Sequence, residues 1–159
     1  MSDLPPPTAP EAAVSHVLAP TAWRCADFVS DLHLQQDDAT WRAFARYLEQ
    51  TPADAVFLLG DIFEVWVGDD ITGAAGHDFE REVARTLRAA SERRALYFMH
   101  GNRDFLVGAA FCAEAGMTLL HDPCVLEWPL AAGGSERILL SHGDALCIDD
   151  VQYIQLRAQ

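Results

Sequence analysis

The sequence has few basic residues for its length. Only 11 of its 159 residues are lysine or arginine, and they form no basic run. The net charge is -13, so a nucleic acid duplex or an anionic membrane would be repelled by the surface unless a local basic patch intervened. The composition therefore argues against a nucleic acid partner. The excess of carboxylates suits the binding of cations instead.

The sequence also lacks paired cysteines. It has four cysteines, none of them in a C-x-x-C arrangement: Cys25, Cys112, Cys124 and Cys147. This spacing argues against a zinc knuckle or a thioredoxin-like redox motif. We expect reduced cysteines that serve mainly as small core residues in a cytosolic protein.

Long apolar runs are absent as well. Residues 1–23 have neither the basic nor the apolar stretch of a signal peptide. Five of the eight prolines lie in the first twenty residues, so this stretch is predicted to be a disordered arm. No run approaches the roughly 20 residues of a membrane span, so any lipid contact would be peripheral. We assign residues 24–159 to one domain.

Apolar segments alternate with amphipathic ones in the rest of the chain. Trp41, Phe44 and Leu48 follow helical spacing. Strands are expected over 25–30, 55–59, 95–99, 118–120, 124–130 and 137–141, and helices over 38–50, 78–90 and 108–115. We expect Asp37 or Asp38 to cap the first helix and Asp78 the second. The order of elements predicts an α/β fold whose sheet is parallel at first and antiparallel later.

Polar groups stand where four of the apolar strands end. The groups are Asp31-x-His33, Gly60-Asp61, Gly101-Asn102-Arg103-Asp104 and His142-Gly143-Asp144. In open α/β sheets, sites form beyond the carboxyl ends of the strands. We therefore expect one pocket that contains Asp31, His33, Asp61, Asn102 and His142.

These five side chains form a mixed oxygen and nitrogen ligand set. Two carboxylates, an amide oxygen and two imidazoles suit a pair of divalent ions such as Mn²⁺, Fe²⁺ or Zn²⁺. Asp61 is the natural candidate to bridge the two ions. Such a pair can activate water and stabilise charge on a phosphorus centre.

Each of these residues also has an ordinary structural interpretation. Asp31 and Asn102 could be turn residues, Asp61 a loop cap, His33 and Arg103 surface groups, and His142 a core histidine; the ordered set at the strand ends favours the functional interpretation. Other polar residues are expected to have structural roles. We interpret His100 as structural and Asp144 as a residue that could orient a histidine. Asp104 is expected to orient Arg103 or its loop. Asp69 and Asp70 are expected to form a solvated loop, with a supporting role behind the metal ligands as the alternative.

The ordered motifs resemble those of the calcineurin-like metallophosphoesterases. That family carries D-x-H, G-D, G-N-x-D and a late histidine, followed by G-H-x-H. The resemblance implies an α/β sandwich of mixed sheets flanked by helices. It also implies metal ligation by Asp31, His33, Asp61, Asn102 and His142, and catalytic roles for these five and Arg103.

A narrower resemblance covers roughly residues 27–157. The segments "LLGDIFEVWVGDD", "HGNRDFLVG" and "SHGDALCIDD" are similar to those of the UDP-2,3-diacylglucosamine diphosphatase family of lipid A biosynthesis. This resemblance implies cleavage of a pyrophosphate to UMP and 2,3-diacylglucosamine 1-phosphate (lipid X), with Mn²⁺ as the metal. It further implies a cytoplasmic enzyme that associates peripherally with the inner membrane. No obligate protein partner is expected.

The residue after Asn102 distinguishes this narrower family from the wider one. Most of the wider family has histidine there, where it protonates the leaving oxygen, but this chain has Arg103. Arginine keeps its proton and can hold a phosphate through a bidentate fork. The resemblance implies that Asn102, Arg103 and Asp150 contact the substrate, although Asp150 could also be a plain helix cap.

Two alternatives to this function remain at the level of sequence. The chain could be a metallophosphoesterase for nucleotides or other phosphoesters, or an inactive fragment. The family's later G-H-x-H is not found among the 159 residues. We therefore expect a C-terminally shortened chain whose activity by itself is greatly reduced.

Overall fold

The computed structural model describes residues 14–36 and 38–146, and its central element is a parallel four-stranded sheet. The strand order is β2-β3-β4-β5. The strands are β2 (Ala26–Val29), β3 (Ala55–Leu59), β4 (Ala95–Met99) and β5 (Met117–Leu120). The strands predicted over 55–59 and 95–99 are therefore confirmed to the residue. The strand predicted over 25–30 is shorter by one residue at each end.

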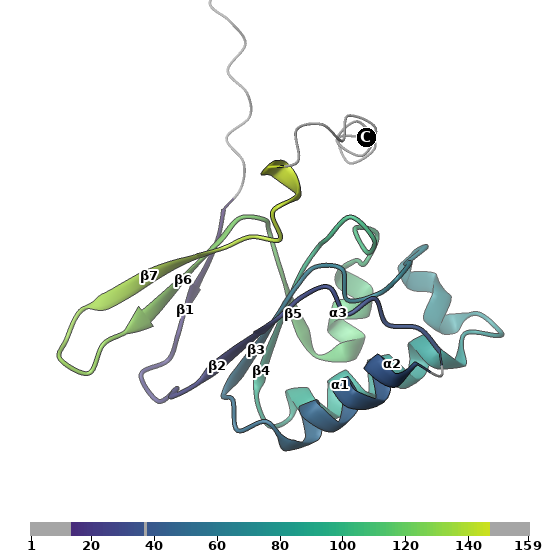
Figure 1. The fold of residues 1–159 in the computed structure, drawn as a ribbon, viewed down its shortest axis with the longest axis horizontal. Helices are drawn as coiled ribbons and strands as arrows, with labels where there is room; N and C mark the ends of the chain where they lie inside the picture. The colour runs from purple at the N-terminus through teal and green to yellow at the C-terminus, as the bar shows by residue number, and fades with distance from the viewer. Residues whose placement is uncertain (1–13, 37, 147–159) are drawn as a thin grey trace, which may run out of the picture.

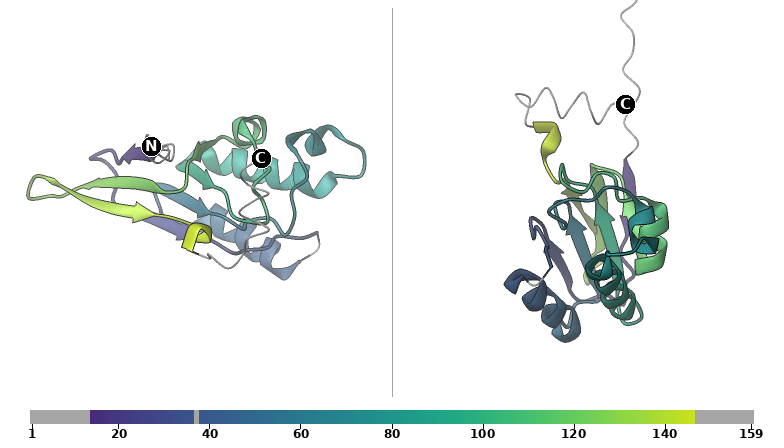
Figure 2. Two further views of the ribbon diagram at one scale, coloured as in Figure 1. Left: turned by 90° about the horizontal axis from the view of Figure 1, so that it is seen from above. Right: turned by 90° about the vertical axis from the view of Figure 1, so that its right-hand side faces the viewer.

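A second sheet of three strands lies beside the first (Figure 1). It contains β1 (Ser15–Leu18), β6 (Cys124–Pro129) and β7 (Ser135–Leu140) in the order β1-β6-β7. The β6–β7 pair is the expected antiparallel hairpin, and it extends away from the helices (Figure 2). The parallel and the antiparallel pairings lie in two separate sheets, because β6 pairs with β1 rather than with β5, and this agrees with the expected sandwich of mixed sheets.

Strand β1 also corrects the prediction of a disordered arm over residues 1–23. Residues 15–18 run parallel to β6, with Ser15 beside Cys124 and Leu18 beside Glu127. Val17 from this strand is buried between the sheets. The prolines around this short segment masked its strand character, and its partner lies far away in the sequence. Residues 1–13 lie outside the described part of the chain.

Three helices cover the face of the parallel sheet that is opposite to the second sheet (Figure 1). They are α1 (Ala39–Gln50), α2 (Asp78–Ser91) and α3 (Ala109–Ala115). Asp38 occupies the N-cap of α1 without a side-chain cap hydrogen bond. His77 rather than Asp78 is the N-cap of α2. As expected, α3 ends at Gly116, whose φ of 71° favours glycine.

Alternate residues of the central strands point to the two sides of the parallel sheet. Val56 and Leu58 of β3 pack against the helices, whereas Ala55 and Phe57 pack against the second sheet. A parallel strand that is buried on both faces reads as a continuous apolar run, as "AVFLL" does here. The two cores hold the strands rigidly and so fix the position of the loops that leave their carboxyl ends.

Candidate metal centre

The loops after β2 and β3 run side by side and bring the first candidate ligands together. The backbone N–H groups of Asp31, His33 and Leu34 donate to the carbonyls of residues 60, 61 and 62, at 3.1, 3.1 and 2.8 Å. These hydrogen bonds continue the parallel pairing beyond the strands. Asp61 is therefore placed between the two ends of the D-x-H motif.

The backbone at this point has an uncommon conformation. Asp31, His33 and Asp61 have φ values of 55°, 48° and 53°, and they are the non-glycine residues with positive φ in the described part of the chain. Left-handed backbone in such residues costs roughly 1–3 kcal/mol each and is concentrated at functional sites. All three strained positions coincide with candidate ligands that the sequence predicted.

The three side chains form a group that could hold a metal ion. One ligand atom from each of Asp31, His33 and Asp61 lies within 4.8 Å of the others. The Nε2 atom of His33 is 4.0 Å from Oδ2 of Asp61. Asp61 is 5% exposed, whereas Asp31 is open to solvent. The site is thus anchored by a buried carboxylate and accessible from outside.

His142 approaches Asp61 from the second sheet. Its Nδ1 donates to the carbonyl of Leu59 at 2.8 Å, which leaves Nε2 as the free nitrogen of the neutral ring. Nε2 lies 3.8 Å from Oδ1 of Asp61 and 3.1 Å from Oδ1 of Asp144. The two Asp61 oxygens therefore face different imidazoles, an arrangement that would allow the carboxylate to bridge two ions. Asp144 contacts His142, as expected for a residue that could orient a histidine, but its carboxylate can hold the ring only while Nε2 carries a proton, because both atoms are otherwise acceptors.

A glycine makes this approach possible. Gly60 has a φ of 84°, and a Cβ atom there would lie 2.6 Å from Nδ1 of His142. The glycine of the G-D motif therefore serves both the turn of the backbone and the approach of His142 from the other sheet.

Asn102 lies directly against the Asp61 carboxylate. One terminal atom of its carboxamide is 2.7 Å from Oδ2 and 3.1 Å from Oδ1 of Asp61. If this atom is the amide nitrogen, it donates hydrogen bonds to the Asp61 carboxylate. If it is the amide oxygen, it faces the carboxylate oxygens as another acceptor, and a cation between them is needed to stabilise the arrangement. Asn102 can thus satisfy Asp61 in the metal-free protein and present its oxygen to a metal ion. An amide oxygen beside a carboxylate is a donor set that suits a divalent cation.

Asp104 fixes the loops that carry these groups. Its buried carboxylate accepts from the backbone N–H groups of Gly101, Asp61, Ile62 and Phe63, at 2.8, 3.3, 2.8 and 3.4 Å. Burial raises the pKa of the Asp104 carboxyl, and the backbone donors oppose this shift. The expectation that Asp104 orients its loop is confirmed, and the same side chain also holds the turn that carries Asp61.

We expect Asp104→Asn to lower the free energy of unfolding by about 2 kcal/mol, because its amide nitrogen would face backbone donors without an acceptor. Urea unfolding at neutral pH measures the difference. Asp70→Asn is the matched control, because Asp70 is exposed. Equal destabilisation of the two variants would contradict the role of Asp104.

Glu64 is a site residue that the sequence analysis missed. Its Oε2 accepts a hydrogen bond from Nδ1 of His33 at 3.0 Å, and its Oε1 accepts one from the Arg103 guanidinium at 3.1 Å. The only available signal was an acidic residue three positions after Asp61. That spacing does not indicate a role by itself, because the partners of Glu64 lie in the loops after β2 and β4, which only the fold brings next to it.

Asp69 corrects the prediction of a solvated loop. Its Oδ1 accepts from the backbone of Gly108 at 2.8 Å, and its Oδ2 accepts from that of Phe111 at 2.9 Å. Asp69 therefore anchors the start of α3, where no N-cap side chain does so. Asp70 is exposed, as expected. The sequence could not reveal this because the two partners are about forty positions away.

The remaining candidate residues lie as follows. His100 donates from Nε2 to the carbonyl of Val107, which confirms its structural role. Arg103 donates its backbone N–H to Oδ1 of Asp61 at 2.9 Å, and its side chain is half exposed. Asp150 lies outside the described residues.

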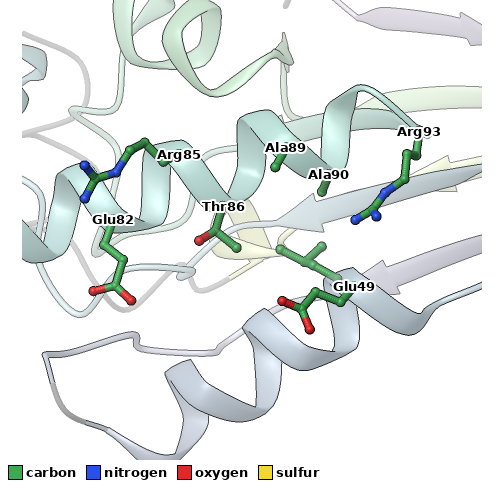
Figure 3. A pocket seen from close by; sticks show the side chains of 8 residues that line it. Glu49, Glu82, Arg85, Thr86, Ala89, Ala90 and Arg93 are labelled. Carbon is green, nitrogen blue, oxygen red and sulfur yellow. The ribbon is translucent and has the colours of Figure 1, made fainter.

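A separate groove of about 550 Å³ lies between α1 and α2 (Figure 3). Its charged lining comes from Glu49, Glu82, Arg85 and Arg93, and it contains none of the strand-end ligands. Carboxylates and guanidinium groups without an imidazole do not match the predicted metal chemistry. The group of side chains that could hold a metal ion is instead at the strand ends.

Comparison with known proteins agrees with this geometry. The family model for the calcineurin-like phosphoesterases matches residues 27–159. The chain belongs to this family. Membership confirms the fold class predicted from the sequence, and the family's chemistry uses divalent metal ions.

Curated members of the phosphoesterase family extend the comparison. A protein of Chromohalobacter salexigens named UDP-2,3-diacylglucosamine hydrolase is 53% identical over 82% of this chain and 51% of its own length. A protein of the same name from Pseudomonas aeruginosa is 47% identical over 82% of this chain and 52% of its own. The narrower resemblance is thereby confirmed. The chain spans about half the length of the curated relatives it matches.

A solved structure of the Pseudomonas putida nuclease MPE is also similar to this chain. It has 14% sequence identity and a TM-score of 0.43, and the match covers 69% of this chain and 66% of that one.

In the described residues, no helix is both long and apolar enough to cross a membrane.

Proposed function

We propose that the protein hydrolyses the pyrophosphate bond of UDP-2,3-diacylglucosamine and releases UMP and 2,3-diacylglucosamine 1-phosphate. The observation that carries this proposal is the position of Asp61 between His33 and His142, with Asn102 against the same carboxylate. The names of the curated relatives supply the substrate. The reaction belongs to lipid A biosynthesis.

Two divalent ions would be held by the strand-end residues. Asp31, His33 and Asp61 would contribute to one position, and Asp61, Asn102 and His142 to the other. The mixed oxygen and nitrogen donors favour Mn²⁺ over Mg²⁺. When bound, such a pair activates water and neutralises charge that develops on phosphorus.

Arg103 supports a pyrophosphate rather than a simple ester as the substrate. Its guanidinium is half exposed beside the ligand cluster, where it can hold a phosphate through two hydrogen bonds. It cannot serve as a proton donor at neutral pH. A leaving group that is itself a phosphate has little need for such a donor. We assign substrate contacts to Asn102 and Arg103, and to Asp150 beyond the described residues.

A lipid substrate also implies contact with the inner membrane, which we propose to be peripheral and on the cytoplasmic side. Exposed apolar side chains follow the site residues along the chain. Val65 and Val67 after Glu64 are 66% and 65% exposed, and Leu106 after Arg103 is 48% exposed. These positions suit contact with acyl chains or lipid. We propose no nucleic acid partner and no obligate protein partner.

A substrate comparison tests the proposal. The protein with Mn²⁺ is expected to release UMP from UDP-2,3-diacylglucosamine much faster than it hydrolyses an aryl phosphate monoester, because Arg103 favours the diphosphate. Product formation is measured by chromatography. Hydrolysis of the ester alone would indicate a phosphoesterase of other specificity, and metal binding without hydrolysis of either would indicate an inactive binding module.

A further inference from the structure

We infer that Glu64 is a positioning residue, which holds a candidate metal ligand with one oxygen and the substrate-binding arginine with the other. The inference rests on the proposed function for the roles of His33 and Arg103. The contacts themselves are direct: Oε2 lies 3.0 Å from Nδ1 of His33, and Oε1 lies 3.1 Å from the Arg103 guanidinium. Each oxygen therefore serves a different partner.

The fold places Glu64 between its partners. Glu64 follows β3, whereas His33 follows β2 and Arg103 follows β4, and these strands are neighbours in the sheet. The bridge between Leu34 and Phe63 holds the two loops together just before Glu64. The Glu64 N–H also donates to the carbonyl of Leu34 at 3.4 Å. The side chain is thus set opposite His33 by backbone pairing.

The contact with His33 determines which ring nitrogen carries the proton. A carboxylate only accepts hydrogen bonds, so the proton of the neutral ring lies on Nδ1. Nε2 then keeps its lone pair, and this is the atom 4.0 Å from Oδ2 of Asp61. Imidazole binds a metal ion through its unprotonated nitrogen, and a carboxylate on the other nitrogen fixes the ring orientation. Glu64 therefore keeps Nε2 of His33 unprotonated and oriented so that it could bind a metal ion.

The contact with Arg103 has a different character. The guanidinium is 50% exposed and the Glu64 carboxylate 37% exposed, and an ion pair this open to water contributes little to stability. Such a pair keeps the guanidinium beside the ligand cluster but yields readily to a phosphate that offers a bidentate contact. Glu64 therefore holds Arg103 in place until the substrate arrives.

Another pair in the same chain provides a matched control. Nδ1 of His77 lies 3.4 Å from Oε2 of Glu80 near the start of α2. This pair also joins a histidine and a glutamate, but it is local, separated by three positions. Glu80→Ala should therefore remove an equivalent contact without any effect on His33.

Nitrogen-15 NMR of the metal-free protein tests the inference at a pH at which the imidazole is neutral. We expect the His33 ring to be predominantly protonated on Nδ1 in the parent protein and to move toward the Nε2-protonated tautomer in Glu64→Ala. Glu64→Gln retains an acceptor oxygen and should restore the Nδ1 tautomer. Arg103→Ala and Glu80→Ala should leave it unchanged, since neither removes the oxygen that His33 uses.

Metal titration provides the second measurement. The Mn²⁺ dissociation constant is expected to rise about tenfold or more in Glu64→Ala and to recover in Glu64→Gln. An unchanged tautomer and unchanged Mn²⁺ affinity in Glu64→Ala would overturn the inference, provided that circular dichroism shows the variant to be folded. The tautomer measurement requires neither metal nor substrate. A protein that fails to cleave UDP-2,3-diacylglucosamine would therefore contradict the proposed function and leave this result intact.

Discussion

Asp61→Asn is expected to lose both metal ions and to lower turnover by about a thousandfold or more, because two-metal stabilisation of the transition state is worth several kcal/mol. The structural reason is that each Asp61 oxygen faces a separate imidazole, His33 on one side and His142 on the other. The carboxylate also receives the Arg103 backbone N–H and lies against Asn102. Replacement of this one carboxylate by an amide of the same shape therefore changes the surroundings of His33, His142 and Asn102 together.

The measurement is the Mn²⁺ content per chain after dialysis, together with the initial rate of UMP release. Asp70→Asn serves as the control, because it removes an exposed carboxylate from the loop that follows "GDIFEVWVG". Loss of activity with an unchanged Mn²⁺ stoichiometry would rule out the bridging assignment of Asp61. A loss of one ion only would assign Asp61 to a single position.

The candidate ligands could be predicted from the sequence because their geometry follows from one property of parallel sheets. The strands that end before Asp31, Asp61 and Asn102 are adjacent in the sheet, so their carboxyl ends lie along one edge. The strands before Asp61 and Asn102 also have the apolar composition of segments inside a parallel sheet, whereas β2 lies at the edge of the sheet and has no buried residue. The local pattern and the position of the polar group were therefore enough to place these side chains together.

The parts that could not be predicted depend on contacts between distant segments. Strand β1 is recognisable only through its pairing with β6, which places Ser15 beside Cys124. Asp69 looks like a loop residue until α3 is placed against it. Glu64 was hidden for the same reason, since its partners lie 31 and 39 positions away. An acidic residue in a loop has many possible roles, and only the tertiary structure selects one.

Arg103→Ala is expected to lower kcat/KM for UDP-2,3-diacylglucosamine by at least about a hundredfold, because a charge-assisted hydrogen bond contributes roughly 1.5–3 kcal/mol and two such bonds are lost. Arg103→Lys should recover only part of this loss. Lysine keeps the charge but has no planar fork, so it cannot hold two phosphate oxygens in a fixed geometry. The rates are measured as UMP release at several substrate concentrations.

Metal binding separates this role from that of the ligands. Arg103 contributes its backbone N–H to Asp61, and that contact survives a change of side chain. The Mn²⁺ stoichiometry of Arg103→Ala should therefore equal that of the parent protein while its rate falls. Arg85→Ala is a suitable control, because Arg85 is an exposed arginine in the groove between α1 and α2. If Arg103→Lys were as active as the parent, simple charge would suffice and the bidentate role would be wrong.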